Sequence, residues 1–193
     1  MAKTRIAQKE QTRRELFELA LDEIRKRGLA EASIDDIARR AGVSRGTFYF
    51  HFPSKEQVVA ELLQASKLGL ARALDELPER APLEAVLERV CTAMTGEWQG
   101  EPRLYLEAGL HGLRQAGNGE AREDDPARSA LSKRFRAAAR ELKSPLSPEV
   151  LADVCLLDLL AAGMAWAGDP SLDLLSTLQA VALLFLDGVR SRR

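Results

Sequence analysis

The sequence predicts an all-α protein. Alanine, leucine, glutamate and arginine prevail along the chain, and β-branched residues rarely occur in runs. Apolar residues recur at three- and four-residue steps, the spacing of an amphipathic helix, in about nine segments that glycine or proline separates. We therefore expect an N-terminal three-helix domain at residues 1–54, followed by a larger helical domain at residues 55–193.

The first two expected helices end at glycines. The first carries apolar residues at helical spacing from Leu16 and stops at Gly28, after a run of three cations. Ser33 can cap the second helix, which ends at Gly42, a position that favours the left-handed backbone conformation. These signals predict two helices joined by a short connection, with a tight turn after the second.

The third expected helix follows that turn directly. Ser44 can cap it, and Phe48 and Phe52 are four residues apart, so both fall on one face. An isolated cluster of aromatic residues such as 48–52 is more often core than surface. Here, however, the pattern is helix, turn, helix, and the second helix of such a unit enters the major groove of DNA.

Charge is unevenly distributed along the chain. Residues 1–58 hold twelve Lys and Arg against nine Asp and Glu, whereas the remaining residues carry an excess of acidic side chains. A basic arm at the N-terminus suits a phosphate backbone, although such a run is also typical of a solvated, disordered tail. The arm consists of Lys3, Arg5, Lys9, Arg13 and Arg14.

Residues 16–63 resemble the TetR family of one-component transcriptional regulators. The resemblance rests on a long pattern with fixed spacing, namely Ser33-Ile34-Asp35-Asp36-Ile37-Ala38, Ala41-Gly42-Val43-Ser44, Gly46-Thr47-Phe48-Tyr49, His51-Phe52 and Ser54-Lys55. One departure is Phe50, where members of this family often carry tyrosine, so this chain lacks a hydroxyl that could bind a phosphate there. The later domain agrees only in helix count and in an apolar C-terminal pair of helices.

The resemblance implies a DNA-binding role for each matching polar position. Thr47 and Arg45 are placed to read bases, Tyr49 and His51 point to phosphates or base edges, and Lys55 can hold a phosphate at a helix start. Gly46 lets the backbone approach the DNA closely. The expected DNA-binding residues are Ser33, Ser44, Arg45, Gly46, Thr47, Tyr49, His51 and Lys55.

Two adjacent helices at the C-terminus, at residues 150–167 and 172–189, are too apolar to bury only one face. They predict a homodimer interface built from two helices of each chain. Asp158, in the first of these helices, then needs a partner, which is an arginine across the interface or a ligand. The expected interface residues are Leu174, Leu178, Val181 and Phe185.

A ligand cavity is expected among the fourth to eighth helices, near Trp98 and Tyr105. Its predicted lining is Met94, Trp98, Tyr105, His111, Phe135, Met164 and Trp166, although aromatic residues at helical spacing are usually core. His111 follows Glu107 by four residues, but a third metal ligand at useful spacing is missing, so a surface pair is favoured over a metal site. A polar loop from Gly117 to Asp125 could gate entry.

Several other functions are disfavoured. The sequence contains no Walker A loop, no dinucleotide-binding glycine pattern, no nucleophile elbow and no His-Glu-x-x-His motif, so we expect no enzyme, no catalytic residues and no cofactor. Residues 150–168 are barely long enough to span a bilayer and contain two aspartates, which favours a buried helix without membrane contact. Two cysteines without metal-like spacing suit a reduced, cytoplasmic protein.

The sequence therefore predicts a TetR-type regulator. We expect a repressor that binds a palindromic operator as a homodimer and is released by a largely apolar small molecule, with one helix linking ligand site and DNA-binding domain. The alternative is a helical adaptor or small-molecule-binding protein without DNA regulation. An adaptor would leave the basic arm and Lys55 without a role.

Overall fold

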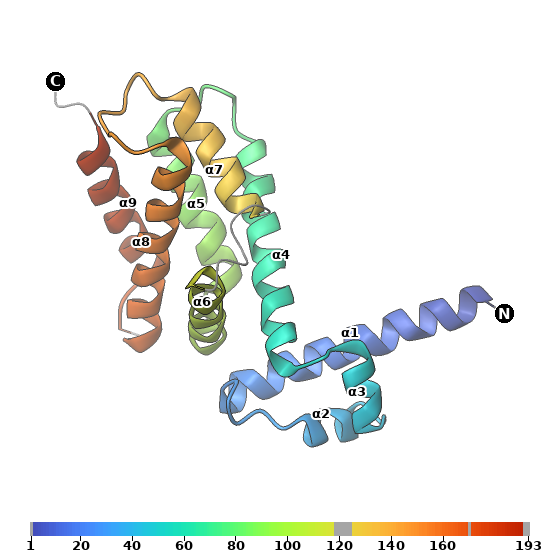
Figure 1. Cartoon of the computed structure of the whole chain (residues 1–193). Helices are drawn as coiled ribbons and strands as arrows, with labels where there is room; N and C mark the ends of the chain where they lie inside the picture. The colour runs from blue at the N-terminus through green and yellow to red at the C-terminus, as the bar shows by residue number, and fades with distance from the viewer. Residues whose placement is uncertain (1, 118–124, 170, 191–193) are drawn as a thin grey trace. The chain divides into compact units, whose positions relative to one another are not determined.

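The computed structural model describes residues 2–117, 125–169 and 171–190, and these ranges form nine α-helices (Figure 1). The chain divides into two compact units between Leu63 and Gln64, a point that lies within α4. The helices are α1 (Ala2–Arg27), α2 (Ile34–Arg40), α3 (Arg45–His51), α4 (Lys55–Asp75), α5 (Leu83–Trp98), α6 (Pro102–Gly117), α7 (Pro126–Ala137), α8 (Pro148–Gly168) and α9 (Leu174–Val189).

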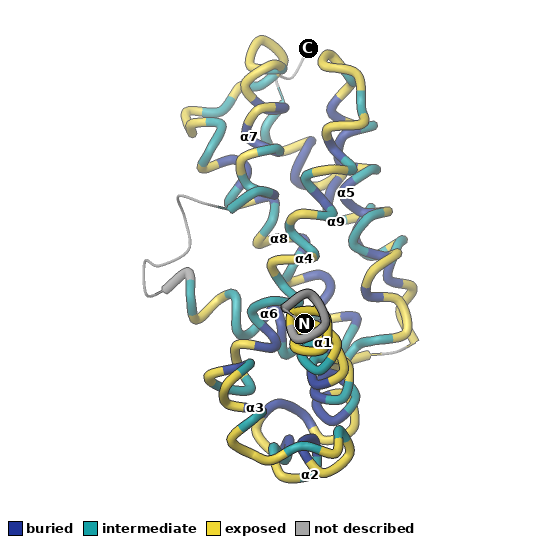
Figure 2. The backbone as a smooth tube through the Cα atoms, turned by 90° about the vertical axis from the view of Figure 1, so that its right-hand side faces the viewer, coloured by how far each residue is buried: buried dark blue, intermediate teal, exposed yellow. Residues whose placement is uncertain are grey.

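The N-terminal unit is built around a small apolar core. Phe48 and Phe52 of α3 and its C-cap are fully buried, as the sequence predicts, and their ring centroids lie 5.8 Å apart. Phe17 of α1 packs on Phe52 at 6.2 Å. In the tube view of Figure 2, buried and exposed stretches alternate along these helices, the pattern of amphipathic helices around a core. The remaining fully buried residues of this core are Leu16, Ala20, Ile24, Ile37, Val58 and Val59.

The turn between α2 and α3 closes in a Schellman motif. Gly42 has φ of 67°, and its amide donates to the carbonyl of Arg39 at 3.1 Å, while the amide of Val43 donates to the carbonyl of Ala38 at 3.0 Å. A Cβ atom at Gly42 would meet no atom within 4 Å. Backbone conformation, and not lack of space, therefore explains the glycine.

The C-terminal unit packs α8 against α6, α7 and α9, and α5 against α9. Proline follows a capping residue at the starts of α7 and α8, where Asp125 and Ser147 accept hydrogen bonds from the amides of Arg128 and Val150. By length and composition α8 could cross a membrane. Its contacts with three neighbouring helices are those of a core helix in a folded bundle.

The C-terminal end of α4 is held by a buried arginine on α7. The guanidinium of Arg134 donates to the carbonyl oxygens of Leu74, Leu77 (3.0 Å) and Pro78 (2.6 Å). Arg134 itself is only 7% exposed. These carbonyls end or follow a helix and have no partner within it, so the arginine caps α4 from a neighbouring element.

The basic arm is helical, because α1 already begins at Ala2. α6 extends over sixteen residues to Gly117. α7 ends at Ala137, and Leu142 beyond it pairs with Arg190 in an isolated β-bridge. Most of the expected gating loop, residues 118–124, lies outside the described residues.

Candidate nucleic-acid interface

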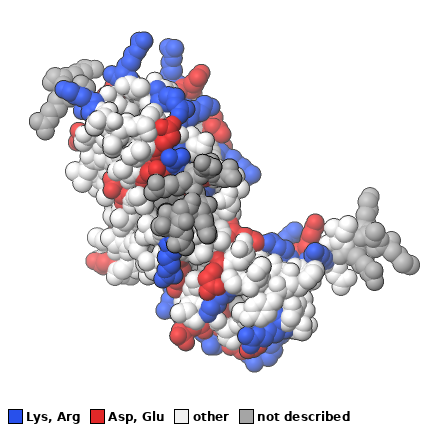
Figure 3. All heavy atoms as spheres, viewed as in Figure 1, with Lys and Arg blue, Asp and Glu red and all other residues white. Residues whose placement is uncertain are grey.

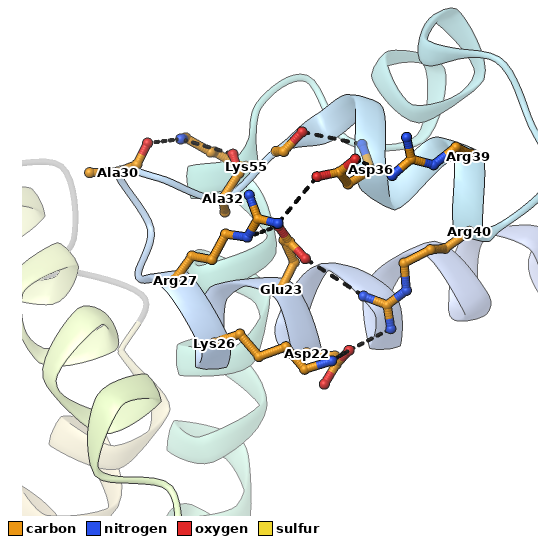
Figure 4. Close-up of polar contacts among 11 residues, drawn as sticks. Asp22, Glu23, Lys26, Arg27, Ala30, Ala32, Asp36, Arg39, Arg40 and Lys55 are labelled. Carbon is orange, nitrogen blue, oxygen red and sulfur yellow. Dashed lines mark hydrogen bonds and ion pairs between the residues drawn. The ribbon is translucent and has the colours of Figure 1, made fainter.

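Ion pairs fix α2 on α1 (Figure 4). The guanidinium of Arg40 contacts both Asp22 and Glu23 of α1, and that of Arg27 lies 2.9 Å from Glu23 and 3.5 Å from Asp36. Glu23 is almost fully buried, so its charge depends on these partners. Hydrogen bonds from Lys26 and Arg40 lower the pKa of Asp22 to about 2. These ion pairs, together with the apolar core, therefore position the helix-turn-helix.

Lys55 also serves this scaffold. Its ammonium donates to the carbonyl oxygens of Ala30 (2.5 Å) and Ala32 (3.3 Å), which lie in the connection between α1 and α2 (Figure 4). An ammonium has three donors, so a phosphate contact, as the sequence predicts, can use the remaining one. Sequence reasoning missed the contact with the connection, because it joins residues distant along the chain.

Two predicted DNA-contacting serines cap helices. The hydroxyl oxygen of Ser33 accepts from the amide of Asp36 at 3.2 Å, and that of Ser44 accepts from the amide of Thr47 at 3.1 Å. The hydroxyls of Ser44 and Thr47 lie 2.9 Å apart. The structure thus brings Ser44 and Thr47 together at the start of α3, where the sequence places them.

Arg45 and Tyr49 form a second pair on the outer side of α3. The guanidinium of Arg45 lies 3.0 Å from a carboxylate oxygen of Asp35, donates to the Tyr49 hydroxyl at 3.3 Å and sits 5.6 Å from the centre of that ring. Both side chains of the ion pair are more than half exposed. Such a pair contributes little to stability, so Arg45 can exchange Asp35 for an outside partner at small cost.

Gly46 is not required by the protein's own packing. A Cβ atom there would meet only the Ser44 hydroxyl, at 3.6 Å, an ordinary contact distance. Its φ is not positive, since only Gly28, Gly42 and Gly100 have positive φ among the described glycines. Glycine within a helix costs about 1 kcal/mol relative to alanine. The packing of the described residues therefore gives no reason for the glycine, and the close approach of its backbone to DNA stays a prediction.

His51 and Phe50 follow on the same helix. Burial, with the nearby charges of Lys9 and Arg13, lowers the pKa of His51 below its ordinary value. Phe50 is 68% exposed, and the ammonium of Lys9 lies 4.8 Å from its ring centroid. Sequence reasoning treated Phe50 only as a missing hydroxyl. The sequence could have predicted that Phe50 is exposed, because Phe48 and Phe52 were already assigned to the core face of the helix and Phe50 lies between them.

Figure 3 shows Lys and Arg side chains over the part of the N-terminal unit that α2 and α3 form, at the lower edge of that view, with some Asp and Glu among them. Arg39, Arg40 and Arg45 supply exposed cations on these two helices, and Lys9 and Arg14 supply them on α1. The surface around α3 thus combines positive charge with exposed aromatic rings. This combination suits a phosphate backbone and the bases beside it.

In the C-terminal unit, three residues expected to line a cavity form one aromatic cluster. Trp98, Tyr105 and Trp166 meet edge to face, with centroids 5.1 Å apart for the first two and 6.1 Å for the last two. A Cβ atom at Gly163 would overlap the Tyr105 ring, so the glycine permits this packing. The Trp98 indole N–H donates to the Ser66 hydroxyl of α4 at 3.2 Å.

The other expected lining residues are not brought together in the same way. Phe135 is fully buried and belongs to the packing of α7 on α9, where its ring contacts Phe185 at 5.8 Å. Met94, His111 and Met164 are half-buried. The ligand cavity stays a prediction. Among the described residues, no group of three or more His, Cys, Asp and Glu side chains is placed to hold a metal ion.

Three of the four expected dimer residues are buried within a single chain. Leu174, Leu178 and Phe185 are at most 8% exposed, whereas Val181 is half-buried. The dimer interface stays a prediction. Asp158, for which an arginine across the interface or a ligand was expected as a partner, is exposed on α8 within a single chain. The exposed apolar side chains on these two helices are Val150, Val154, Leu157, Leu183 and Leu184.

Fold and site together define a helix-turn-helix transcriptional regulator. Residues 16–62 match the family described as bacterial regulatory proteins, tetR family. The regulator SrpR of Pseudomonas putida is 27% identical over 188 residues, which span 95% of this chain and 87% of SrpR. The uncharacterized regulator TtgW, also of Pseudomonas putida, is 35% identical over 94 residues, which span 49% of this chain and 68% of TtgW.

The solved structures agree with this assignment. The TetR-family repressor FadR of Thermus thermophilus, determined in complex with lauroyl-CoA, superimposes with a TM-score of 0.70 at 25% identity and covers 94% of this chain and 96% of its own. The chain therefore belongs to the tetR family of bacterial regulatory proteins. The all-α architecture and the family predicted from the sequence are both confirmed.

Proposed function

We propose that the protein is a cytoplasmic repressor, and not an enzyme, which binds a palindromic operator as a homodimer and leaves it when a small, largely apolar molecule binds the C-terminal unit. The observation that carries the proposal is the outer surface of α3, where Arg45, Gly46, Thr47 and Tyr49 follow a Schellman turn and present no side chain that the core requires. In this geometry α3 is the recognition helix of a helix-turn-helix.

Homodimer formation fits the exposed apolar side chains of α8 and α9. Val154, Leu157, Leu183 and Leu184 are each at least 36% exposed on helices that already pack against each other. Exposed apolar side chains gathered on two packed helices are typical of an interface. In the symmetric assembly the same surface of both copies meets, which forms a four-helix contact. The recognition helices of a competent dimer should lie roughly 34–36 Å apart, one turn of DNA.

An apolar effector fits the aromatic cluster of Trp98, Tyr105 and Trp166, which comes within reach of α4 through Ser66. FadR of Thermus thermophilus was determined with lauroyl-CoA, a molecule with a long apolar chain. We expect the dimer to have a DNA-binding state and a released state, which differ in the spacing of the recognition helices. A ligand that alters the packing of α4 can shift the equilibrium between these states only to the extent that its affinity for them differs.

The DNA-binding roles are tested by isotherms on operator and random duplexes at several salt concentrations. Lys55→Ala should weaken both duplexes alike and reduce the slope of log K against log salt by ~0.9 for each phosphate that is no longer neutralised. Thr47→Ala and Arg45→Ala should each cost roughly 1–3 kcal/mol per base contact on the operator and less on random DNA. Melting temperatures serve as a control, because Lys55 also holds the α1–α2 connection. Loss of operator preference in Lys55→Ala, with its retention in both other variants, would reverse the assigned roles.

A further inference from the structure

Phe50 is the most exposed aromatic side chain of α3. It is 68% exposed, compared with 40% for Tyr49, whereas Phe48 and Phe52 are fully buried. A phenylalanine ring has no polar atom, so it forms no hydrogen bond with the surrounding water. The core of the N-terminal unit is complete without this ring. An exposed phenylalanine on a recognition surface therefore offers a purely apolar contact to a partner.

The ring is held in place by its neighbours. The Lys9 ammonium lies 4.8 Å from its centroid, and the His51 ring meets it nearly at right angles, with centroids 5.2 Å apart. The cation–π contact with Lys9 comes from α1, so two elements fix the position of one side chain. A positioned ring loses little rotational freedom when it binds, which favours recognition.

Gly46 precedes Phe50 by one helical turn and therefore lies on the same face of α3. The protein has room for a Cβ atom at Gly46, and the φ of this residue is not positive. The glycine therefore leaves the backbone uncovered beside the exposed ring of Phe50. The two positions together present a surface without polar side-chain atoms. The polar residues of α3, Arg45 and Tyr49, bond to each other beside it.

The chemistry of the DNA major groove supplies one matching partner. Of the four bases only thymine presents an apolar group there, the methyl at C5, and phosphates lie along the edge of the groove. An apolar ring flanked by the cation of Lys9 matches an apolar group flanked by an anion. An apolar protein surface would leave the Lys9 charge without a partner at the contact.

We propose that Phe50 reads the methyl group of a thymine in each half of the operator, in the space that Gly46 leaves open. The inference rests on the proposed DNA-binding function and names a base-specific contact within it. Phe50 is then a specificity-determining residue.

Uracil substitution tests the contact, because uracil differs from thymine only by that methyl. Selection from a random duplex library with the wild-type protein first yields the preferred sequence, and each of its thymines is then replaced in turn. At one thymine in each half-site, we expect uracil to weaken wild-type binding about fourfold per methyl, the value of burying one such group. The same replacement should leave the affinity of Phe50→Ala unchanged. Phe50→Tyr, which keeps the ring, should retain the thymine preference.

Arg14→Ala is the matched control, since it removes an exposed cation of α1 and should weaken thymine and uracil duplexes alike. Equal melting temperatures of wild type and Phe50→Ala confirm folding. If the uracil effect is the same in wild type and Phe50→Ala, or if no thymine replacement matters in a selected sequence, the contact is refuted. If the wild-type protein selects no sequence at all, the proposed function itself fails.

Discussion

The helices before Leu63 and those after Gln64 are held together by different kinds of contact. In the N-terminal unit, caps, a left-handed glycine and an ion-pair network fix three helices around a small core. In the C-terminal unit, long apolar helices pack through aliphatic side chains and through aromatic clusters. The first unit therefore relies on an ion-pair network between α1 and α2 around a small core, whereas the second relies more on packed apolar volume, with polar contacts such as those of Arg134 at helix ends.

The same difference extends to the surfaces. Around α3 many of the exposed side chains are cationic or aromatic, and around α8 and α9 many are aliphatic. A charged and aromatic surface with fixed geometry suits a polyanion that has a regular repeat, such as DNA. An aliphatic surface suits a second copy of itself. The following substitutions test this difference between the two units, from the largest expected effect to the smallest.

The largest effect is expected on α9, where two leucines differ in burial. Leu178 is fully buried and Leu184 is 71% exposed. Leu178→Arg places a charge in the core and should cost roughly 4–5 kcal/mol, enough to unfold many domains. Leu184→Arg should leave the fold intact but separate the dimer. Circular dichroism and light scattering on both variants distinguish the outcomes, and a dimer of wild-type strength in Leu184→Arg would exclude this surface.

A smaller contrast is expected between two glycines of the helix-turn-helix. Gly42→Ala forces alanine into a left-handed conformation and should cost about 1–2 kcal/mol. Gly46→Ala meets no close atom and should raise stability by up to about 1 kcal/mol, yet weaken DNA binding through the added methyl. Urea unfolding and operator isotherms measure the two quantities. A Gly46→Ala variant that binds as tightly as wild type would show that the backbone does not approach DNA here.

The smallest effect is expected for Asp22, whose pKa is lowered to about 2 by hydrogen bonds from Lys26 and Arg40. A carboxylate with a lowered pKa contributes stability above its unfolded pKa of about 3.9 and loses that contribution as the pH falls towards about 2. Asp22→Asn should therefore be less stable than wild type at pH 7, and the difference should shrink as the pH falls and vanish only below about pH 2. Unfolding across this range measures the difference, and a gap that does not shrink towards low pH would assign the effect to packing.

Local signals in the sequence were sufficient for much of the recognition unit. Ser33, Ser44 and Gly42 act through atoms within a few residues, and spacing alone placed Phe48 and Phe52 on one inner face. Contacts between distant segments could not be predicted in this way. The Lys9 ammonium on Phe50 depends on how far α1 extends as a helix, which its basic composition concealed.

For the apolar helices α8 and α9, the sequence does not predict which side chains are buried. Leu178 and Leu184 are the same residue type on the same helix, and both belong to an apolar pattern that surrounds it. Which of them faces the core depends on where α5 and α8 pack, and periodicity carries no information about that when every face is apolar. The sequence therefore predicted that α8 and α9 are apolar on more than one side, but not which leucines of α9 are exposed within the chain.

Arg134 of α7, which caps the C-terminal end of α4, limits how α4 can respond to an effector. Arg134 is buried and occupies three carbonyl oxygens that only a helix ending near Asp75 presents. Unwinding or extending the last turn of α4 would leave a buried guanidinium without acceptors, at a cost of several kcal/mol. Any change that an effector transmits along α4 is therefore restricted to tilting or bending of an intact helix, hinged where Arg134 holds it.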